Sequence, residues 1–140
     1  GCMLSVPGSA TQPWHSDGDH LCAKRHLPPH CLNVFVPLVD VTSKNGATEF
    51  VPRSHIDWGS DQPPVTPLTT AGECVLFDYR LKHRGLGNRS SEDRPMLYFT
   101  YGRASFVDQF NFSHKRYQVL PELDPEMEGD RRVRRLRRRS

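Results

Sequence analysis

The sequence lacks the long apolar runs of membrane proteins and the long proline-free stretches of helix bundles and coiled coils. It contains a single isoleucine, Ile56, and only 9% of its 140 residues are aromatic. Its 12 prolines are spread along the chain and leave few stretches in which a long helix could run. No apolar run approaches the roughly 18–20 residues that a membrane span needs, and there is no signal-peptide pattern. We therefore expect one domain of short elements, without a membrane span.

The cysteines do not have the spacing of a disulfide framework. Because a few irregularly spaced thiols fit a reducing compartment, we expect an intracellular, cytoplasmic protein. Two cysteines and two histidines fall within residues 22–31 (CAKRHLPPHC), but this segment lacks the paired ligands and the separating hairpin or helix of zinc sites. Zinc binding is therefore the less favoured interpretation. The four cysteines are Cys2, Cys22, Cys31 and Cys74.

Charge divides the chain into an acidic body and a basic end. Residues 131–139 (RRVRRLRRR) hold seven arginines, whereas residues 1–129 carry 12 basic and 15 acidic side chains. Since like charges repel, we expect residues 121–140 to form a disordered tail, acidic and then arginine-rich, after a domain over 1–120. Such a tail can bind nucleic acid non-specifically, but no aromatic residues alternate with the arginines to stack bases. A small molecule is the expected partner, and the oligomeric state is left open.

Short extended runs separated by Gly and Pro turns predict an all-β fold of the sandwich or jelly-roll type. The run at 31–41 is apolar on both sides of the strand, so we expect both of its faces to be covered. Asn45-Gly46 suits a turn with positive φ. Residues 105–120 are expected to hold a short helix or an irregular segment. The predicted strands cover 3–6, 10–17, 31–41, 48–52, 73–79 and 95–102, and the loops between them include 18–30, 53–71 and 80–94.

The pattern His15-Ser16-Asp17 places an imidazole and a carboxylate on the same face of a strand, about 7 Å apart along the chain. Two such groups can be neighbouring ligands of one metal, and a third ligand must come from elsewhere. His83 is the candidate, because it follows the predicted strand 73–79 and could return beside the first two. Two histidines and one carboxylate are the ligand set of non-haem Fe(II) oxygenases.

An arginine stands eleven residues after this histidine. Arg94 directly precedes the predicted strand 95–102. Its planar guanidinium can bind a carboxylate through two hydrogen bonds, so beside a metal it would suit a dicarboxylate such as 2-oxoglutarate. Taken alone, H-x-D and one arginine are common surface features, and Arg94 could equally pair with Asp93 or Glu92. Both interpretations stay open at this point.

Together, these segments make the chain similar to the phytanoyl-CoA dioxygenase family of Fe(II)/2-oxoglutarate-dependent oxygenases. The similarity covers residues 10–103, and more loosely FVDQFNF at 106–112. The order of features agrees: H-x-D, an NGAT turn and strand leading into P-x-SH, a distal histidine, and an arginine eleven residues later. The matching segments are WHSDG at 14–18, VPLVDVTSKNGATEFVPRSH at 36–55, GECVLFDYRLKHRGLGNRSSEDRP at 72–95 and LYFTYG at 97–102.

The resemblance implies a double-stranded β-helix, a jelly-roll barrel with the metal inside one end. It implies Fe(II) held by His15, Asp17 and His83, with Arg94 on the distal carboxylate of 2-oxoglutarate. The implied reaction uses O2, releases succinate and CO2, hydroxylates an unactivated C–H of a small organic or acyl substrate, and is helped by ascorbate. Related halogenases lack the carboxylate ligand, so Asp17 favours hydroxylation. By the same resemblance, three more residues contact the co-substrate: Gln12, Thr48 and Asn33.

Two features depart from the family pattern. Relatives carry N-terminal helices and a first strand that are missing or reduced here, so we expect a barrel truncated at its N-terminal side. Arg53 stands where relatives commonly have glycine, which predicts strain in that turn. The alternative function is a non-catalytic, cupin-like metal-binding jelly-roll module, which would use the same ligands but would not need Arg94.

Overall fold

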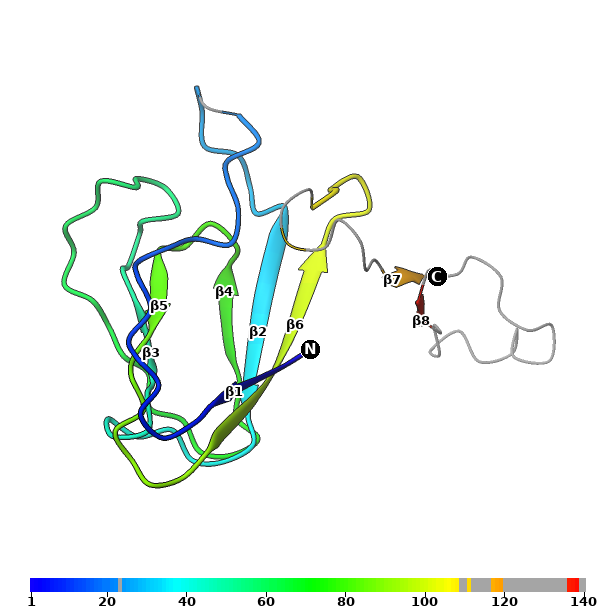
Figure 1. Cartoon of the computed structure of the whole chain (residues 1–140). Helices are drawn as coiled ribbons and strands as arrows, with labels where there is room; N and C mark the ends of the chain where they lie inside the picture. Colours follow the sequence, from blue (N-terminus) through cyan, green and yellow to red (C-terminus); the bar gives the residue numbers. More distant parts are fainter. Residues whose placement is uncertain (23, 109–110, 112–116, 120–135, 139–140) are drawn as a thin grey trace. The chain divides into compact units, whose positions relative to one another are not determined.

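The computed structural model describes residues 1–22, 24–108, 111, 117–119 and 136–138 (Figure 1). The chain divides into two units, residues 1–107 and 108–140. In the second unit, β7 (Tyr117–Val119) pairs antiparallel with β8 (Leu136–Arg138). The rest of the predicted disordered tail at 121–140 lies outside the described residues, so that part stays a prediction. Within 105–120, residues 105–108 are irregular, and most of the remainder lies outside the described part as well.

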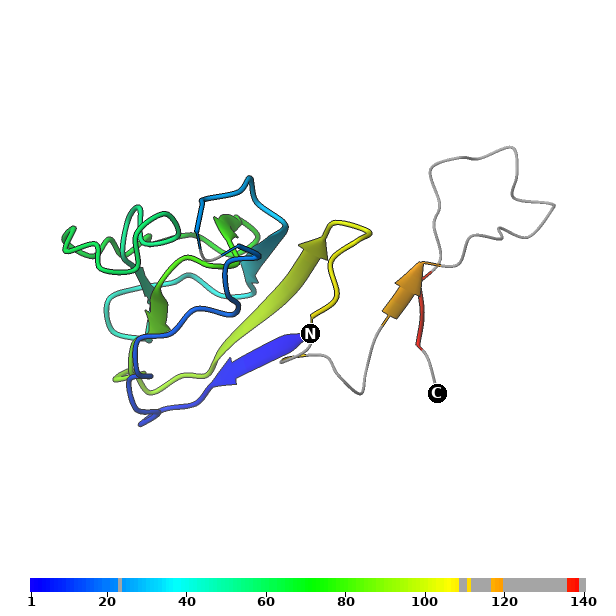
Figure 2. The same cartoon turned by 90° about the horizontal axis from the view of Figure 1, so that it is seen from above.

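The first unit consists of two antiparallel sheets, which lie beside each other in both views (Figures 1 and 2). The larger sheet contains, in spatial order, β1 (Cys2–Ser5), β6 (Arg94–Gly102), β2 (Cys31–Pro37) and β4 (Val75–Asp78). The smaller sheet pairs β3 (Thr48–Phe50) with β5 (His83–Gly85). Every regular element among the described residues is a strand, as predicted, and none of these residues forms a helix of the length and hydropathy that a bilayer requires.

The core lies between the two sheets and is mainly aromatic. The Phe35 and Phe77 rings are 4.8 Å apart at their centroids, and the Phe50 and Phe77 rings 4.9 Å apart. Burying a side chain of this size stabilises a fold by about 1.5–3 kcal/mol, so a small cluster is enough to join the sheets. The buried cluster consists of Phe35 in β2, Phe50 in β3, Phe77 in β4 and Met96 in β6.

The outer face of β2 is only half-buried. The prediction that both faces of this strand are covered is therefore wrong for the face that carries Leu32, Val34 and Val36. Alternation along the strand turns the neighbouring residues Cys31, Asn33, Phe35 and Pro37 inward, where they are buried. The residues that flank the outer face on β4 and β6 are exposed apolar side chains: Leu76 (60%), Phe99 (44%) and Tyr101 (63%).

Five of the six predicted strands are present with shifted ends, but residues 10–17 do not form one. Only His15 makes an isolated bridge there, to His83. Its partner strand β5 was missed, because the sequence HRG in the predicted loop 80–94 has no apolar alternation. Two reciprocal backbone hydrogen bonds join His15 and His83, at 3.0 and 2.8 Å, and the Gln12 N–H donates to the Gly85 carbonyl at 2.9 Å. The chain before His15 therefore runs beside β5 without regular pairing.

The Asn45-Gly46 turn has the predicted geometry, with a φ of 85° at Gly46. A Cβ at Gly46 would lie 2.5 Å from the carbonyl oxygen of Leu86, so a larger residue would force the two backbones apart. The turn also has a consequence for the site, because the carbonyl of Asn45 accepts a hydrogen bond from Nε of Arg94 at 3.0 Å. A glycine turn far from Arg94 in sequence thus fixes the direction of its guanidinium.

Arg53 is the one non-glycine residue with positive φ among the described residues, at 65°. Replacing it by glycine is expected to raise the free energy of unfolding by about 0.5–1 kcal/mol, because glycine adopts this conformation without a Cβ clash. Urea denaturation would measure the change. The matched control is Arg53→Ala, which removes the charged side chain but keeps the Cβ. A gain of the same size in the alanine variant would contradict the explanation by backbone strain.

Candidate metal centre and anion cavity

The three predicted metal ligands lie close together in the first unit. One ligand atom each from His15, Asp17 and His83 can be chosen so that all three lie within 4.8 Å of one another. The bridge to β5 brings His15 beside His83, and the N–H of Asp17 is bonded to the carbonyl of Tyr79 at 3.1 Å. Among the described residues, no other set of three His, Cys, Asp or Glu side chains is this close. The segment 22–31 therefore does not form a comparable site.

Both histidines present the same ring nitrogen toward the metal position. Nδ1 of His15 lies 2.9 Å from the carbonyl of Pro13, and Nδ1 of His83 lies 2.8 Å from the carbonyl of Leu81. A carbonyl can only accept a hydrogen bond, so each Nδ1 carries a proton, and Nε2 is the ring nitrogen that can bind a metal. Nε2 of His83 lies 3.6 Å from Oδ2 of Asp17. Two imidazole nitrogens and a carboxylate thus converge without a rotamer change.

Aromatic rings surround the imidazole of His83. The ring of Phe50 stacks on it at 5.9 Å and 25°, and the ring of Phe77 meets it edge-on at 5.0 Å. Burial in this apolar setting lowers the pKa of His83, although the carbonyl of Leu81 and the charge of Asp17 act in the opposite direction. The imidazole is therefore neutral at neutral pH, which is the form that binds a metal.

Arg94 lies inside the first unit and lines a small cavity. It is 6% exposed, and burial lowers the pKa of its guanidinium, which still remains charged at neutral pH. Its described contacts are to neutral acceptors: Nε donates to the carbonyl of Asn45 and Nη1 to Sδ of Met96 at 3.8 Å. The predicted alternative partners Asp93 and Glu92 are both exposed. The cavity is lined by Phe35, Pro37, Val41, Thr48, Phe50, Pro67, Thr69, Val75, Arg94 and Met96.

A buried cation among neutral and apolar groups is costly unless an anion joins it. The cavity also reaches toward the metal position, since Phe35 and Phe50 line it and both rings contact His83, at 6.4 and 5.9 Å. The cavity and the metal ligands therefore share the walls formed by Phe35 and Phe50, while none of the three ligands lines the cavity itself.

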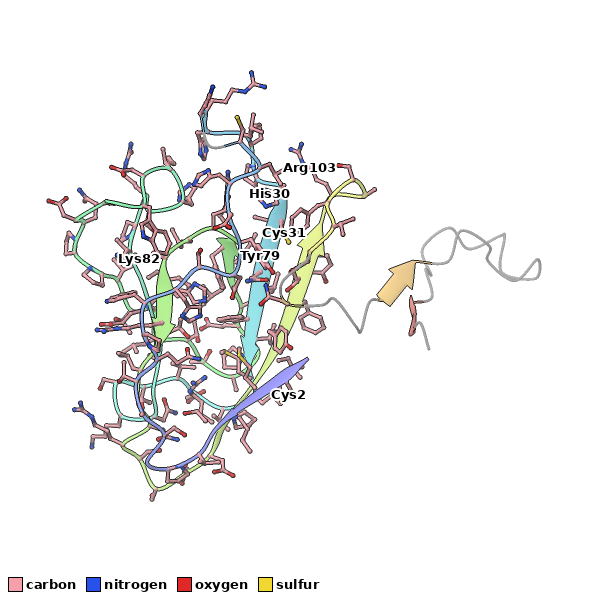
Figure 3. The ribbon with its side chains drawn as sticks, turned by 45° about the horizontal axis from the view of Figure 1, so that its top comes forward. Cys2, His30, Cys31, Tyr79, Lys82 and Arg103 are labelled. Carbon is pink, nitrogen blue, oxygen red and sulfur yellow. The ribbon has the colours of Figure 1, made fainter. Side chains whose placement is uncertain are left out.

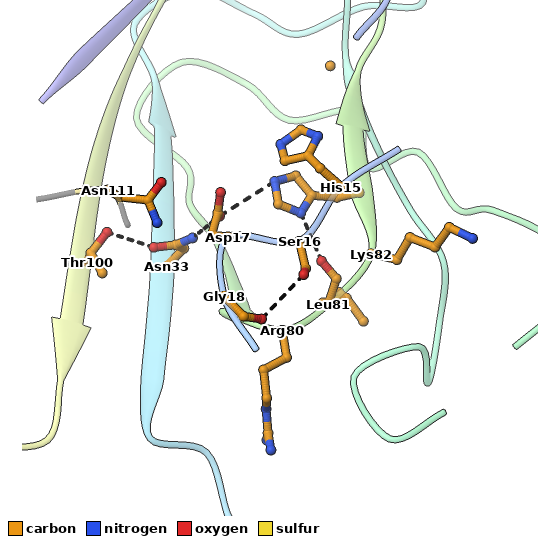
Figure 4. Close-up of polar contacts among 12 residues, drawn as sticks. His15, Ser16, Asp17, Gly18, Asn33, Arg80, Leu81, Lys82, Thr100 and Asn111 are labelled. Atoms are coloured by element: carbon orange, nitrogen blue, oxygen red, sulfur yellow. Dashed lines mark hydrogen bonds and ion pairs between the residues drawn. The ribbon is translucent and has the colours of Figure 1, made fainter. Parts of the chain in front are cut away.

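The three further predicted co-substrate contacts are placed differently. Thr48 lines the cavity with Arg94. The side-chain oxygen of Gln12 accepts the N–H of Gly85 at 2.8 Å, and Nδ2 of Asn33 donates to Oδ2 of Asp17 at 2.6 Å (Figure 4). Gln12 and Asn33 are thus engaged with β5 and with the acidic ligand, and a contact of either with the co-substrate remains a prediction.

Sequence reasoning gave no role to Thr100, which donates to Oδ1 of Asn33 at 2.7 Å. Thr100 has no motif around it that would mark it. Only the pairing of β2 with β6, which sets Asn33 opposite Thr100, brings it to the site. The aromatic residues around His83 likewise looked like ordinary core residues in the sequence.

His30 lies outside the metal group and is deeply buried, close to Cys31, Tyr79 and Arg103 (Figure 3). It is 3% exposed, its ring lies 4.6 Å from that of Phe106, and neither ring nitrogen has a hydrogen-bond partner among the described residues. Burial lowers the pKa of His30, and the charge of Arg80 lowers it further, while Asp78 opposes the shift. Arg80 and Asp78 form a buried pair, joined at 2.8 and 2.7 Å.

Because the folded state holds His30 neutral below its unfolded pKa of about 6.5, acid should weaken the fold. We expect the free energy of unfolding of the metal-free protein to be highest above that pH and to fall as the pH is lowered toward 5, where the unfolded chain binds the extra proton. Urea denaturation from pH 8 to 5 measures the slope. The slope should be shallower in His30→Leu, which removes the buried imidazole. Equal slopes in the wild type and His30→Leu would contradict the prediction.

Among the described residues, an all-β fold brings two imidazoles and a carboxylate together, as in jelly-roll proteins of the metal-binding type. The family model of phytanoyl-CoA dioxygenase (PhyH) matches residues 1–96, and the chain belongs to this family. This confirms the family suggested by the sequence motifs, and with it the predicted jelly-roll fold.

Individual relatives agree with this assignment. The chain is 33% identical to the dioxygenase aneA of Aspergillus aculeatus, over 85% of this chain and 44% of that protein. It is 28% identical to the dioxygenase trt7 of Aspergillus terreus, over 86% of this chain and 45% of that protein. Among solved structures, AviO1 from Streptomyces viridochromogenes matches with a TM-score of 0.64 and 25% identity, over 74% of this chain and 49% of that one. The chain thus spans about half the length of the relatives it matches.

Proposed function

We propose that the protein is an Fe(II)/2-oxoglutarate-dependent dioxygenase that hydroxylates an unactivated C–H bond of a small organic or acyl substrate. The observation that carries the proposal is the buried Arg94, which lines a cavity whose walls also contact the ligand His83. Membership of the phytanoyl-CoA dioxygenase family and the dioxygenase names of the relatives support it. The proposed reaction converts R–H, O2 and 2-oxoglutarate into R–OH, succinate and CO2.

Each residue of the site has a definite part in this reaction. His15, Asp17 and His83 would hold Fe(II), which supplies the activation of O2 when it is bound. Arg94 would bind the distal carboxylate of 2-oxoglutarate through its guanidinium and so fix the direction of the co-substrate. The rings of Phe50 and Phe77 exclude water from one side of the His83 imidazole, which keeps that ligand neutral and in place.

The alternative function, a non-catalytic cupin-like module, would use the same three ligands. It gives no reason for a buried arginine on the adjoining cavity, because metal binding by two histidines and a carboxylate does not need one. The position of Arg94 therefore favours the oxygenase over the binding module.

The direct test is co-substrate turnover by the purified chain. With Fe(II), ascorbate, O2 and 2-oxoglutarate, we expect succinate above the level of a reaction that lacks iron, and more succinate when a true substrate is present. Controls without enzyme measure the spontaneous decarboxylation of 2-oxoglutarate. If a broad substrate panel gives no succinate although the metal binds, the cupin-like alternative would be favoured.

A further inference from the structure

A chain of two hydrogen bonds leads from strand β6 to the acidic metal ligand. The hydroxyl of Thr100 donates to Oδ1 of Asn33 at 2.7 Å, and Nδ2 of Asn33 donates to Oδ2 of Asp17 at 2.6 Å (Figure 4). Asn33 belongs to β2, and the β2–β6 register places it directly opposite Thr100. The strand register alone therefore places the two residues side by side on the inner face of the larger sheet.

The direction of both hydrogen bonds follows from the chemistry of the acid. An ionised carboxylate can only accept, so the amide group that faces Asp17 must be the NH2 of Asn33. The amide oxygen then faces Thr100, and the threonine hydroxyl must be the donor. If the amide of Asn33 flipped, its oxygen would face the carboxylate at 2.6 Å, which is repulsive. Asp17 therefore sets the orientation of the Asn33 amide, and the Thr100 hydroxyl supports that orientation by donating to the amide oxygen.

The burial pattern shows why the acid benefits from this support. The Asp17 side chain is 26% exposed, whereas that of its co-ligand His83 is 4% exposed. Packing against Phe50 and Phe77 holds His83, but a partly exposed aspartate can turn about two side-chain torsions. Asn33 is 4% exposed and lies on a central strand, so its position is fixed. A charge-assisted hydrogen bond from such a group restricts the carboxylate to one orientation.

We propose that Thr100 and Asn33 are positioning residues that together hold the carboxylate of Asp17 in its metal-binding orientation. The inference rests on the proposed function only in that the His15–Asp17–His83 group binds a metal. In this proposal Asn33 holds the carboxylate of Asp17 instead of contacting the co-substrate, and Thr100 has a role that no sequence motif indicates.

The test measures metal affinity rather than turnover. The probe is Co(II) without co-substrate, titrated into the full chain and followed by its visible absorption. Thr100→Val has nearly the same shape as threonine but cannot donate, so we expect its dissociation constant for Co(II) to rise about 10-fold, within the range that loss of such outer contacts causes. Thr100→Ser restores the hydroxyl and should restore the affinity. Thr70→Val, at an exposed threonine before β4, is the matched control and should bind like the wild type.

Asn33→Ala should weaken Co(II) binding by about 10- to 100-fold. Circular dichroism with thermal melting checks whether this variant folds. If the variant does not fold, the Thr100 variants test the proposal. Wild-type affinity in Thr100→Val would overturn the proposal, as would a folded Asn33→Ala that binds Co(II) normally but loses 2-oxoglutarate. Failure of the wild type to bind Co(II) would instead remove the proposed function together with this inference. The two failures are thus distinguishable.

Discussion

Asp17→Ala is expected to abolish metal binding and, with it, succinate formation. Asp17 is the single carboxylate in the ligand group, and the two histidines can contribute only an uncharged ring nitrogen, Nε2, to a bound metal. Its removal leaves a divalent ion with two uncharged ligands and no compensating negative charge. We expect the affinity for Fe(II) or Co(II) to fall by more than 100-fold, beyond the roughly 10- to 100-fold effect of losing an outer contact, and succinate to fall to the level without iron.

The control for this change is Asp19→Ala. Asp19 is an exposed carboxylate two residues further along the same segment, outside the ligand group. It should keep the metal affinity and the turnover of the wild type, which separates a specific ligand effect from a change in local charge. If Asp17→Ala still bound the metal with nearly unchanged affinity, the assignment of the ligand group would be wrong.

Arg94→Met is expected to lose 2-oxoglutarate binding while the metal site stays intact. Methionine has a similar length but no charge, so the variant keeps the cavity filled and removes only the anion-binding group. Removing one partner of a buried, hydrogen-bonded charge pair costs about 2–5 kcal/mol, so we expect the affinity for 2-oxoglutarate to fall by about 30-fold or more. Co(II) affinity should be unchanged. Calorimetric titration of 2-oxoglutarate into the metal-loaded protein measures the loss.

The free energy of unfolding of the Arg94→Met variant distinguishes a binding role of Arg94 from a structural one. Without an anion, its buried charge is solvated only by the carbonyl of Asn45 and the sulfur of Met96 among its described partners. Replacing Arg94 by methionine should therefore lower the free energy of unfolding of the co-substrate-free protein by no more than about 1 kcal/mol. Arg89→Met, at an exposed arginine, should bind 2-oxoglutarate normally. A large loss of stability in Arg94→Met, with unchanged co-substrate affinity, would contradict the assignment.

Most strands, one turn and the candidate site residues could be predicted from the sequence, because they depend on local chemistry. Prolines and the lack of long apolar stretches predicted a chain without long helices or a membrane span, and alternating apolar runs located five strands within a few residues of their positions. The Asn45-Gly46 turn followed from glycine's freedom at positive φ, which the structure confirms. The spacing of His15 and Asp17, together with His83 and Arg94, carried the resemblance to the family, because ligand residues keep their order along a chain even when their surroundings vary.

The remaining features depend on contacts between residues that are far apart in sequence. Strand β5 has no apolar pattern and exists because its backbone pairs with β3 and with the segment around His15. Thr100 reaches the site only through the β2–β6 register, and a shift by one residue would turn it to the opposite face. The residue types and their order along the chain therefore determined which groups are available, whereas strand pairing decided which of them meet, since hydrogen bonding and burial act through space rather than along the sequence.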